Sequence, residues 1–318
     1  MMIPAASGAI ALAAALDWLF REPPARVHPV ALLGRLVSRV DQQWSRPRLL
    51  GAVAAFTLPL VAAGAAALLV GLAALVGHTA MLLATGFVLF STTSLRMLLD
   101  AARSVVDDSD TDPDAAKQNL RALAGRDPTD LSSGELRSAA VESAAENLAD
   151  GLVAPLLAFT VLAPLSLPVA AAAAAWVKAV NTLDSMLGYR DKPVGWAPAR
   201  LDDVVMWLPA RVSAVLVAVA SGDLGSLARA REWSQNPPSP NSGWPMATLA
   251  AVLDVRLDKP DVYVLNRNVA LPTPADATHG IRIVAVAGAF AWGLAFASTL
   301  LASRFSILDL LSGAAAWF

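Results

Sequence analysis

The sequence predicts an all-α, polytopic integral membrane protein whose helices are connected by polar islands. Hydrophobic residues make up 56% of the 318 residues, above the roughly 45–50% of soluble domains. Charged residues make up only 16%, against about 25% in soluble domains. Long apolar runs recur along the chain, and no polar segment between them is long enough to build a separate soluble domain. We therefore expect a single membrane-embedded domain over residues 1–318.

The apolar runs are predicted as helices in the order in which they occur. A short first helix covers residues 3–16, and no Lys or Arg precedes it, as one would in a cleavable signal peptide. The runs at 50–76 and 79–99 are long enough to cross a bilayer, because a span needs about 20 apolar residues. The run at 281–302 meets the same requirement.

Two further runs are less regular. Residues 152–176 contain Pro164 and Pro168, and proline removes a backbone donor and kinks a helix. We expect two half-helices of about 10 residues each, which dip into the membrane and return to the same face. The run at 204–220 is short and contains Arg211, so we expect it to be interfacial or a second re-entrant element.

Charge distribution predicts the sidedness of the polar islands. The segment 17–48 is rich in arginine and contains only three acids, so the positive-inside rule places it in the cytoplasm. The re-entrant element would put the islands at 100–150, 177–203 and 221–280 on that same side. A net charge of −2 gives no basic footprint for nucleic acid. The absence of cysteine excludes disulfides and thiolate metal sites.

The first candidate site lies in the segment VESAAENLADGLVAP, residues 141–155. Glu142, Glu146 and Asp150 are spaced four apart and share one face of a helix. Like charges at this spacing cost a few tenths of a kcal/mol per pair, which a divalent cation or a basic substrate would relieve. The alternative is a solvated helix face, although the apolar residues that follow place this face at a membrane boundary.

The second candidate site is the island at residues 178–205. It contains two polar groups, namely Lys178, Asn181 and Asp184 at helical spacing and Arg200, Asp202 and Asp203 after them. Mg²⁺ prefers oxygen ligands and is often held by one or two carboxylates with substrate phosphates, while Lys and Arg bind phosphates directly. The island therefore fits a metal–phosphate site. An ion-paired loop that caps the membrane helices explains the same residues.

Two shorter segments add polar side chains. The segment NPPSPNSGWP, residues 236–245, is predicted as a rigid loop in which Ser239 and Asn241 offer hydrogen bonds to a polar ligand. A simple turn between helices is the alternative. His28 follows the first helix and precedes a proline, and a lone histidine is more often structural than catalytic.

Four motifs occur together in a fixed order: HPVALLGRL, AENLADGLVAPL, KAVNTLDSMLGY with ARLDDV and PAR, and SPNSGWP followed by AAVLDVRL. This combination resembles the adenosylcobinamide-phosphate synthase family, CobD/CbiB, of cobalamin biosynthesis. The resemblance implies a membrane ligase that joins adenosylcobyric acid to an aminopropanol phosphate, or a related amino-alcohol phosphate, through an amide bond. It implies ATP as co-substrate and Mg²⁺ as cofactor. The family often has an acid where this chain has Met246, which can neither transfer a proton nor bind Mg²⁺.

The resemblance and the residue types together assign hypothetical roles. The catalytic candidates are Glu146, as a base for the incoming ammonium, with Asp184 and Asp203. The candidate metal ligands are Asp150, Asp184, Asp202 and Asp203. The candidate substrate- and phosphate-binding residues are His28, Asn147, Lys178, Asn181, Arg200, Ser239 and Asn241.

Two other functions fit the composition. A polytopic transporter of a polar solute would place polar residues along a path through its spans, whereas here they cluster in the connecting islands. A noncatalytic membrane subunit for corrinoid assembly is a third reading. The expected partners are the corrinoid, the amino-alcohol phosphate, ATP and the lipid bilayer; nucleic acid is not expected, and a homo-oligomer is left open. We expect a multi-pass protein of the cytoplasmic (inner) membrane with its active site facing the cytoplasm.

Overall fold

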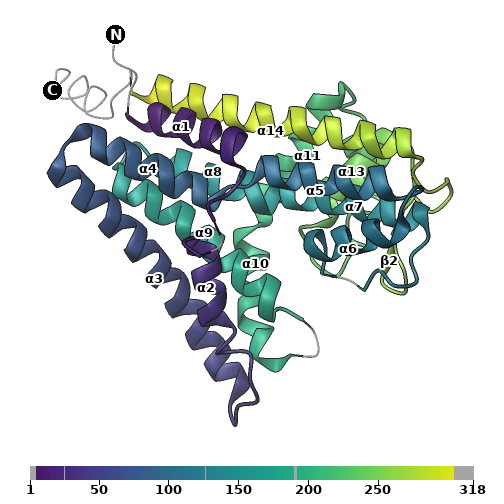
Figure 1. Ribbon diagram of the computed structural model, residues 1–318, viewed down its shortest axis with the longest axis horizontal. Coiled ribbons are helices and arrows are strands. Elements are labelled where there is room, and N and C mark those ends of the chain that lie inside the picture. Colours follow the sequence, from purple (N-terminus) through teal and green to yellow (C-terminus); the bar gives the residue numbers. More distant parts are fainter. Residues whose placement is uncertain (1–4, 25, 126, 190–191, 304–318) are drawn as a thin grey trace, which may run out of the picture. The chain divides into compact units, whose positions relative to one another are not determined.

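The computed structural model describes residues 5–24, 26–125, 127–189 and 192–303 (Figure 1). Helices dominate the described residues, which confirms the all-α prediction. One short antiparallel hairpin is the exception among them, formed by β1 (Leu257–Lys259) and β2 (Tyr263–Leu265) with Leu257 opposite Leu265.

The helices follow one another along the chain. Those in the first half are α1 (Ala5–Phe20), α2 (Pro29–Val37), α3 (Pro47–Val76), α4 (His78–Thr92), α5 (Leu95–Asp108), α6 (Pro113–Leu123), α7 (Ser133–Leu148), the π-helical turn η1 (Ala149–Val153) and α8 (Ala154–Leu162). Those in the second half are α9 (Leu167–Leu187), the 3₁₀ turn η2 (Pro193–Gly195), α10 (Trp196–Val205), α11 (Trp207–Ser221), α12 (Ser226–Ala230), α13 (Gly243–Leu253) and α14 (Pro274–Ala302).

The chain divides into two compact units that alternate along the sequence. Unit 1 comprises Met1–Thr93, Pro155–Ala199 and Trp292–Phe318. Unit 2 comprises Ser94–Ala154 and Arg200–Ala291. Each unit is therefore assembled from segments that are far apart in the sequence.

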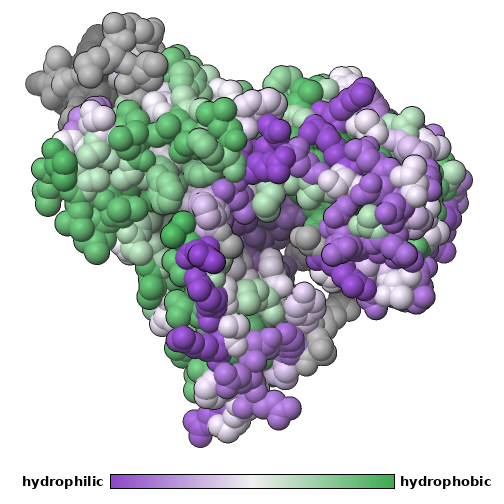
Figure 2. All heavy atoms as spheres, viewed as in Figure 1, coloured by the Kyte–Doolittle hydropathy of each residue, from purple (hydrophilic) through white to green (hydrophobic). Residues whose placement is uncertain are grey.

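Several helices are long and apolar enough to cross a membrane. Four stretches meet this criterion, namely Pro47–Val76, His78–Asp108, Ser133–Leu162 and Pro274–Ala302. The predicted helices at 50–76, 79–99 and 281–302 are thus confirmed. Apolar side chains cover much of the visible surface of α3 (Figure 2), and only 17% of its most apolar window is buried within the protein. A helix this apolar and this exposed indicates a multi-pass membrane protein, because lipid would cover it.

The run at 204–220 belongs to a bent pair of helices, and its interfacial or re-entrant placement stays a prediction. Residues Pro193–Val205 and Trp207–Ser221 form two helices bent by 50° at Met206, as in a broken span or a re-entrant loop.

The expectation for residues 152–176 is partly wrong. The helix does break between Leu162 and Leu167, but the flanking pieces are not half-helices of about 10 residues. The preceding piece ends a continuous helical stretch that begins at Ser133, and α9 alone has 21 residues. Pro168 occupies the first turn of α9, where a missing N–H costs nothing, so this proline starts a long helix.

In unit 1, helix α9 is held in place by apolar side chains that pack against it. Leu33 and Val37 of α2 form a buried cluster with Leu183 and Leu187 of α9. Helix α3 also packs along α9, and α1 lies against α4 (Figure 1). The register of α9 is therefore set by apolar contacts on several sides.

Unit 2 is built around α7. Helices α5, α6 and α13 and strand β1 all pack against α7, and α11 packs against α13. A capping box starts α7, in which the Ser132 hydroxyl and the Glu135 carboxylate each bind the other residue's backbone N–H. Leu136 and Leu148 are fully buried, so this helix is the core element of its unit.

Candidate functional site

The residues predicted for the site belong to both units. His28, Lys178, Asn181 and Asp184 lie in unit 1, and Glu146, Asn147, Asp150, Arg200, Asp202, Asp203, Ser239 and Asn241 lie in unit 2.

His28 serves as the N-cap of α2. Its Nδ1 accepts a hydrogen bond from the Val30 backbone N–H at 3.1 Å, and its Nε2 lies 3.4 Å from a carboxylate oxygen of Glu22. Because Nδ1 is an acceptor, the proton is on Nε2 and faces Glu22. The ring is only 8% exposed. The geometry accounts for this histidine through helix capping, and its predicted contact with substrate stays a prediction.

Asn181 and Asp184 lie on α9 as predicted, one turn apart near its C-terminus. The C-cap residue Gly188 donates its N–H to the Asp184 carbonyl at 2.7 Å. A Cβ on Gly188 would lie 1.9 Å from the Asp184 Oδ1, so only glycine lets the carboxylate rest against the helix end. The local sequence LDSMLGY therefore fixes where this acid can lie.

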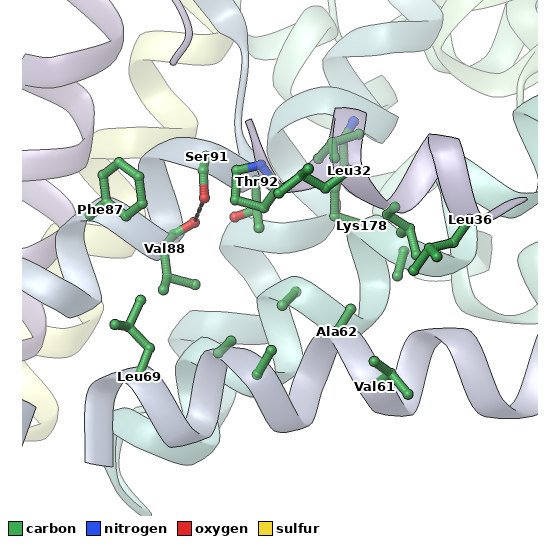
Figure 3. A pocket seen from close by; sticks show the side chains of 17 residues that line it. Leu32, Leu36, Val61, Ala62, Leu69, Phe87, Val88, Ser91, Thr92 and Lys178 are labelled. Carbon is green, nitrogen blue, oxygen red and sulfur yellow. Dashed lines mark hydrogen bonds between the residues drawn. The ribbon is translucent and has the colours of Figure 1, made fainter. Parts of the chain in front are cut away.

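Lys178 borders a cavity of about 290 Å³ within unit 1 (Figure 3). Apolar side chains of α2, α3 and α4 line most of it, among them Leu36, Leu69 and Phe87. Lys178 is half-buried, so its methylene stem contributes to this apolar wall.

Lys192, in the loop after α9, pairs with an acid from the connection between α2 and α3. Lys192 Nζ lies 2.7 Å from an Asp41 carboxylate oxygen and 5.2 Å from the centre of the Tyr189 ring. Lys192 is therefore ion-paired within unit 1.

Glu146, Asn147 and Asp150 lie at the junction of α7 and the π-helical turn. All three are half-buried, and the Asn147 Nδ2 donates to the Ser143 carbonyl at 2.9 Å. In the π turn, the Gly151 carbonyl accepts from the Ser94 N–H at 2.8 Å. Such π turns are frequent at functional sites because they redirect one residue of a helix. Asp150 lies in this π-helical turn, so the regular α-helix assumed for the acid row ends before it.

The SPNSGWP loop is tied to α10 and α11. The Asn241 Nδ2 donates to the Asp203 carbonyl at 2.8 Å, and its Oδ1 accepts from the Arg211 guanidinium. Arg211 also donates to the Pro240 carbonyl at 3.2 Å. The loop itself is closed by the Ser239 Oγ, which accepts from the Asn241 N–H at 3.2 Å.

The same contacts place the acids of α10 beside this loop. Asp202 is buried, and Asp203 lies 3.4 Å from the guanidinium of the exposed Arg200. Within unit 2, Asn241 thus ties the SPNSGWP loop to α10, and the roles of Asp202 and Asp203 in a common site stay predictions. Arg211, which donates to Asn241, was not among the predicted site residues. Its position in the short motif PAR was the only local signal.

Glu142, the first acid of the predicted row, carries a buried carboxylate, and its partners could not be predicted from the sequence. It is 1% exposed and accepts hydrogen bonds from the Ser138 hydroxyl at 2.8 Å and the Tyr263 hydroxyl at 2.6 Å. The Tyr263 oxygen also lies 3.6 Å from the Met246 sulfur. Glu142 thereby joins α7 to the β hairpin, and Met246 lies against this group.

Among the residues that the structure describes, no group of three or more His, Asp or Glu side chains is gathered closely enough to hold a metal ion. Mg²⁺ often takes only one or two protein carboxylates and completes its shell with phosphate oxygens and water. Such binding needs carboxylate oxygens, which Asp184, Asp202 and Asp203 can supply. Their role in Mg²⁺ binding stays a prediction.

These features define a helical membrane protein with polar sites at the ends and breaks of its helices. The chain belongs to the CobD/Cbib protein family, whose model matches residues 10–310. It is 36% identical over 287 residues to the probable cobalamin biosynthesis protein CobD of Methanothrix thermoacetophila, covering 86% of this chain and 90% of that protein. It is 39% identical over 259 residues to the cobalamin biosynthesis protein CobD of Mycobacterium tuberculosis, covering 78% and 79% of the two chains. No solved structure matches it.

Proposed function

We propose that this protein is a membrane-bound enzyme of cobalamin biosynthesis that forms an amide bond between adenosylcobyric acid and an aminopropanol phosphate, or a related amino-alcohol phosphate. The observation that carries the proposal is the similarity to proteins named for cobalamin biosynthesis over most of both chains, at 34–39% identity. The specific reaction is inferred from the resemblance of the four ordered motifs to the adenosylcobinamide-phosphate synthase family.

The reaction requires activation of a carboxylate. A carboxylate does not react with an amine at neutral pH, because its carbonyl carbon is a poor electrophile. Transfer of the γ-phosphoryl group of ATP to the carboxylate forms an acyl phosphate and releases ADP. The amine nitrogen then attacks the acyl carbon, inorganic phosphate leaves, and one proton is released. Catalysis of phosphoryl transfer depends mainly on positioning and on neutralising charge.

The side chains of the two polar islands suit these steps. Lys178 and Arg200 can hold phosphate oxygens, and Mg²⁺ bound through Asp184, Asp202, Asp203 or Asp150 would neutralise charge on ATP. Glu146 is half-buried at the end of α7 and can accept the proton of the incoming ammonium. Asn147, Asn181, Ser239 and Asn241 can orient the substrates. We place the site on the cytoplasmic face, because it must use the cytoplasmic ATP pool.

The test is direct reconstitution. Purified protein is incubated with adenosylcobyric acid, aminopropanol phosphate, ATP and Mg²⁺, and the corrinoid is analysed by mass spectrometry. We expect the amide-linked phosphate only when ATP and Mg²⁺ are both present. A folded protein that forms no amide with either amino-alcohol phosphate would exclude the proposed reaction.

A further inference from the structure

A polar pocket lies wholly within unit 2. It has a volume of about 540 Å³ and lies between the turn that precedes the SPNSGWP loop and the β hairpin. Its polar and aromatic lining residues are Glu232, Trp233, Asn236, Asn266, Arg267 and Asn268. None of these was predicted as a site residue. The phenol ring of Tyr263 also lines the pocket, and its hydroxyl is fixed by the buried Glu142.

The charges of the pocket balance. Glu232 and Arg267 are its two charged residues, and Arg267 also interacts electrostatically with the Asp258 carboxylate. A phosphate group carries about −1.5 to −2 at neutral pH, and ATP carries more. One guanidinium opposed by one carboxylate is a poor site for such anions. One positive and one negative side chain together favour a ligand whose part inside the pocket is polar and uncharged.

The hydrogen-bonding groups match a ligand with amide groups. The Asn236 Nδ2 donates to the Val264 carbonyl at 2.8 Å, and the Asn266 Nδ2 donates to the Asp254 carboxylate at 3.3 Å. Each Nδ2 therefore keeps a second N–H that can donate to a ligand, and each Oδ1 remains an acceptor. Arg267 supplies donors only. A primary amide meets both requirements, because its NH₂ donates and its carbonyl accepts.

The pocket also offers apolar contact and ample size. Trp233 is half-buried and Val262 is 48% exposed, so a ring edge or methyl group can cover them. A volume of about 540 Å³ lies within the roughly 300–1,000 Å³ of pockets for drug-sized ligands. A small amino-alcohol phosphate would leave most of this space unfilled.

We propose that this pocket binds the rim of the corrinoid substrate, which carries methyl groups and acetamide and propionamide side chains. The assignment rests on the proposed function, because that function supplies the corrinoid. Within it, amide groups bind Glu232, Arg267 and the three asparagines, and methyl groups contact Trp233. The pocket thereby holds the corrinoid by groups that do not react.

The experiment compares three pocket variants, Glu232→Gln, Arg267→Gln and Asn268→Ala, with Arg231→Gln as the matched control. Arg231 is exposed in the same turn but does not line the pocket. KM is measured for each substrate. Equilibrium dialysis with cobinamide, followed by its visible absorbance, measures binding of a corrinoid that keeps the amide rim but lacks the reacting carboxylate.

We expect Arg267→Gln to raise the KM for adenosylcobyric acid and the Kd for cobinamide about tenfold, the effect of losing one hydrogen bond to a charged donor. Asn268→Ala and Glu232→Gln should raise both constants less. KM for ATP and for the amino-alcohol phosphate should stay constant in all three variants, and Arg231→Gln should match the wild type.

Unchanged corrinoid KM and cobinamide affinity in the folded pocket variants would overturn the assignment, as would a shift confined to ATP or to the amino-alcohol phosphate. If the wild-type protein forms no amide, the proposed function fails separately. Cobinamide dialysis then still decides the pocket, because weaker binding in Arg267→Gln supports the assignment and unchanged binding refutes it.

Discussion

Asn241 provides the sharpest structural test of the loop that carries the SPNSGWP motif. The side chain is 3% exposed, and both ends of its amide are bonded within the protein, one to Arg211 and one to the Asp203 carbonyl. Replacing it by alanine removes a charge-assisted bond of about 1.5–3 kcal/mol and a neutral bond of about 1 kcal/mol. We therefore expect Asn241→Ala to lower the free energy of unfolding by about 2.5–4 kcal/mol.

The assay is thermal unfolding of the detergent-solubilised protein. At roughly 2–4 °C per kcal/mol, Tm should fall on the order of 5–15 °C. Ser239→Ala is the control, because it removes one hydrogen bond from the same loop and should lower Tm by only a few degrees. A Tm within about 2 °C of wild type, together with a raised KM, would refute this reasoning. It would show that the two hydrogen bonds of the Asn241 amide contribute little to the stability of the loop.

Three further predictions concern catalysis, pH and topology. Asp184→Asn and Asp203→Asn keep the side-chain size but remove the charge, so kcat should fall at least about a hundredfold, or about 2.7 kcal/mol, while Tm is kept. Burial raises the pKa of the Asp258 carboxyl despite the nearby Arg256 guanidinium. The contribution of Asp258 to the free energy of unfolding is therefore fully present below the pKa of about 3.9 that it has in the unfolded chain. This contribution is lost as pH rises through the higher pKa of the folded protein. Asp258→Asn should raise Tm at pH 7, and the gain should shrink toward pH 4. Single cysteines at the four exposed positions should react with an impermeant reagent from the same side of the membrane: Gln42→Cys, Asp130→Cys, Ser185→Cys and Gln235→Cys.

Each of these has a clear contrary result. Near-wild-type turnover in both acid variants would leave Asp184 and Asp203 as structural residues. A Tm gain for Asp258→Asn that is the same at pH 4 and pH 7 would remove carboxylate burial as its cause. Labelling of Ser185→Cys from the side opposite to Gln42→Cys would exclude a common cytoplasmic face.

Local patterns in the sequence were sufficient to predict the long helices. Apolar runs of span length predicted α3 and the apolar part of α14, because continuous hydrophobicity needs no partner to be recognised. The spacing of Lys178, Asn181 and Asp184 placed them on one helix, since three-residue steps stay near one face. The proline pair marked the break before α9.

The contacts that build the polar sites could not be predicted in this way. Glu142 and Tyr263 are 121 residues apart, and Arg211 and Asn241 are 30 apart. Their pairing depends on how distant helices and strands pack together. A single sequence contains no local pattern that predicts such a pairing. The π-helical turn at Asp150 was not predicted from the sequence, because it also depends on a distant contact. Its Gly151 carbonyl is satisfied by Ser94, which lies far away in the sequence.

Activation of the corrinoid carboxylate by ATP is the central claim, and oxygen-18 transfer tests it most directly. Adenosylcobyric acid labelled with oxygen-18 in its free carboxylate is converted by the purified protein with ATP, Mg²⁺ and aminopropanol phosphate. The account predicts that each amide formed moves one labelled oxygen to the phosphate product, which is inorganic phosphate for an acyl phosphate or AMP for an adenylate. Formation of the amide with no labelled oxygen in either product would contradict it.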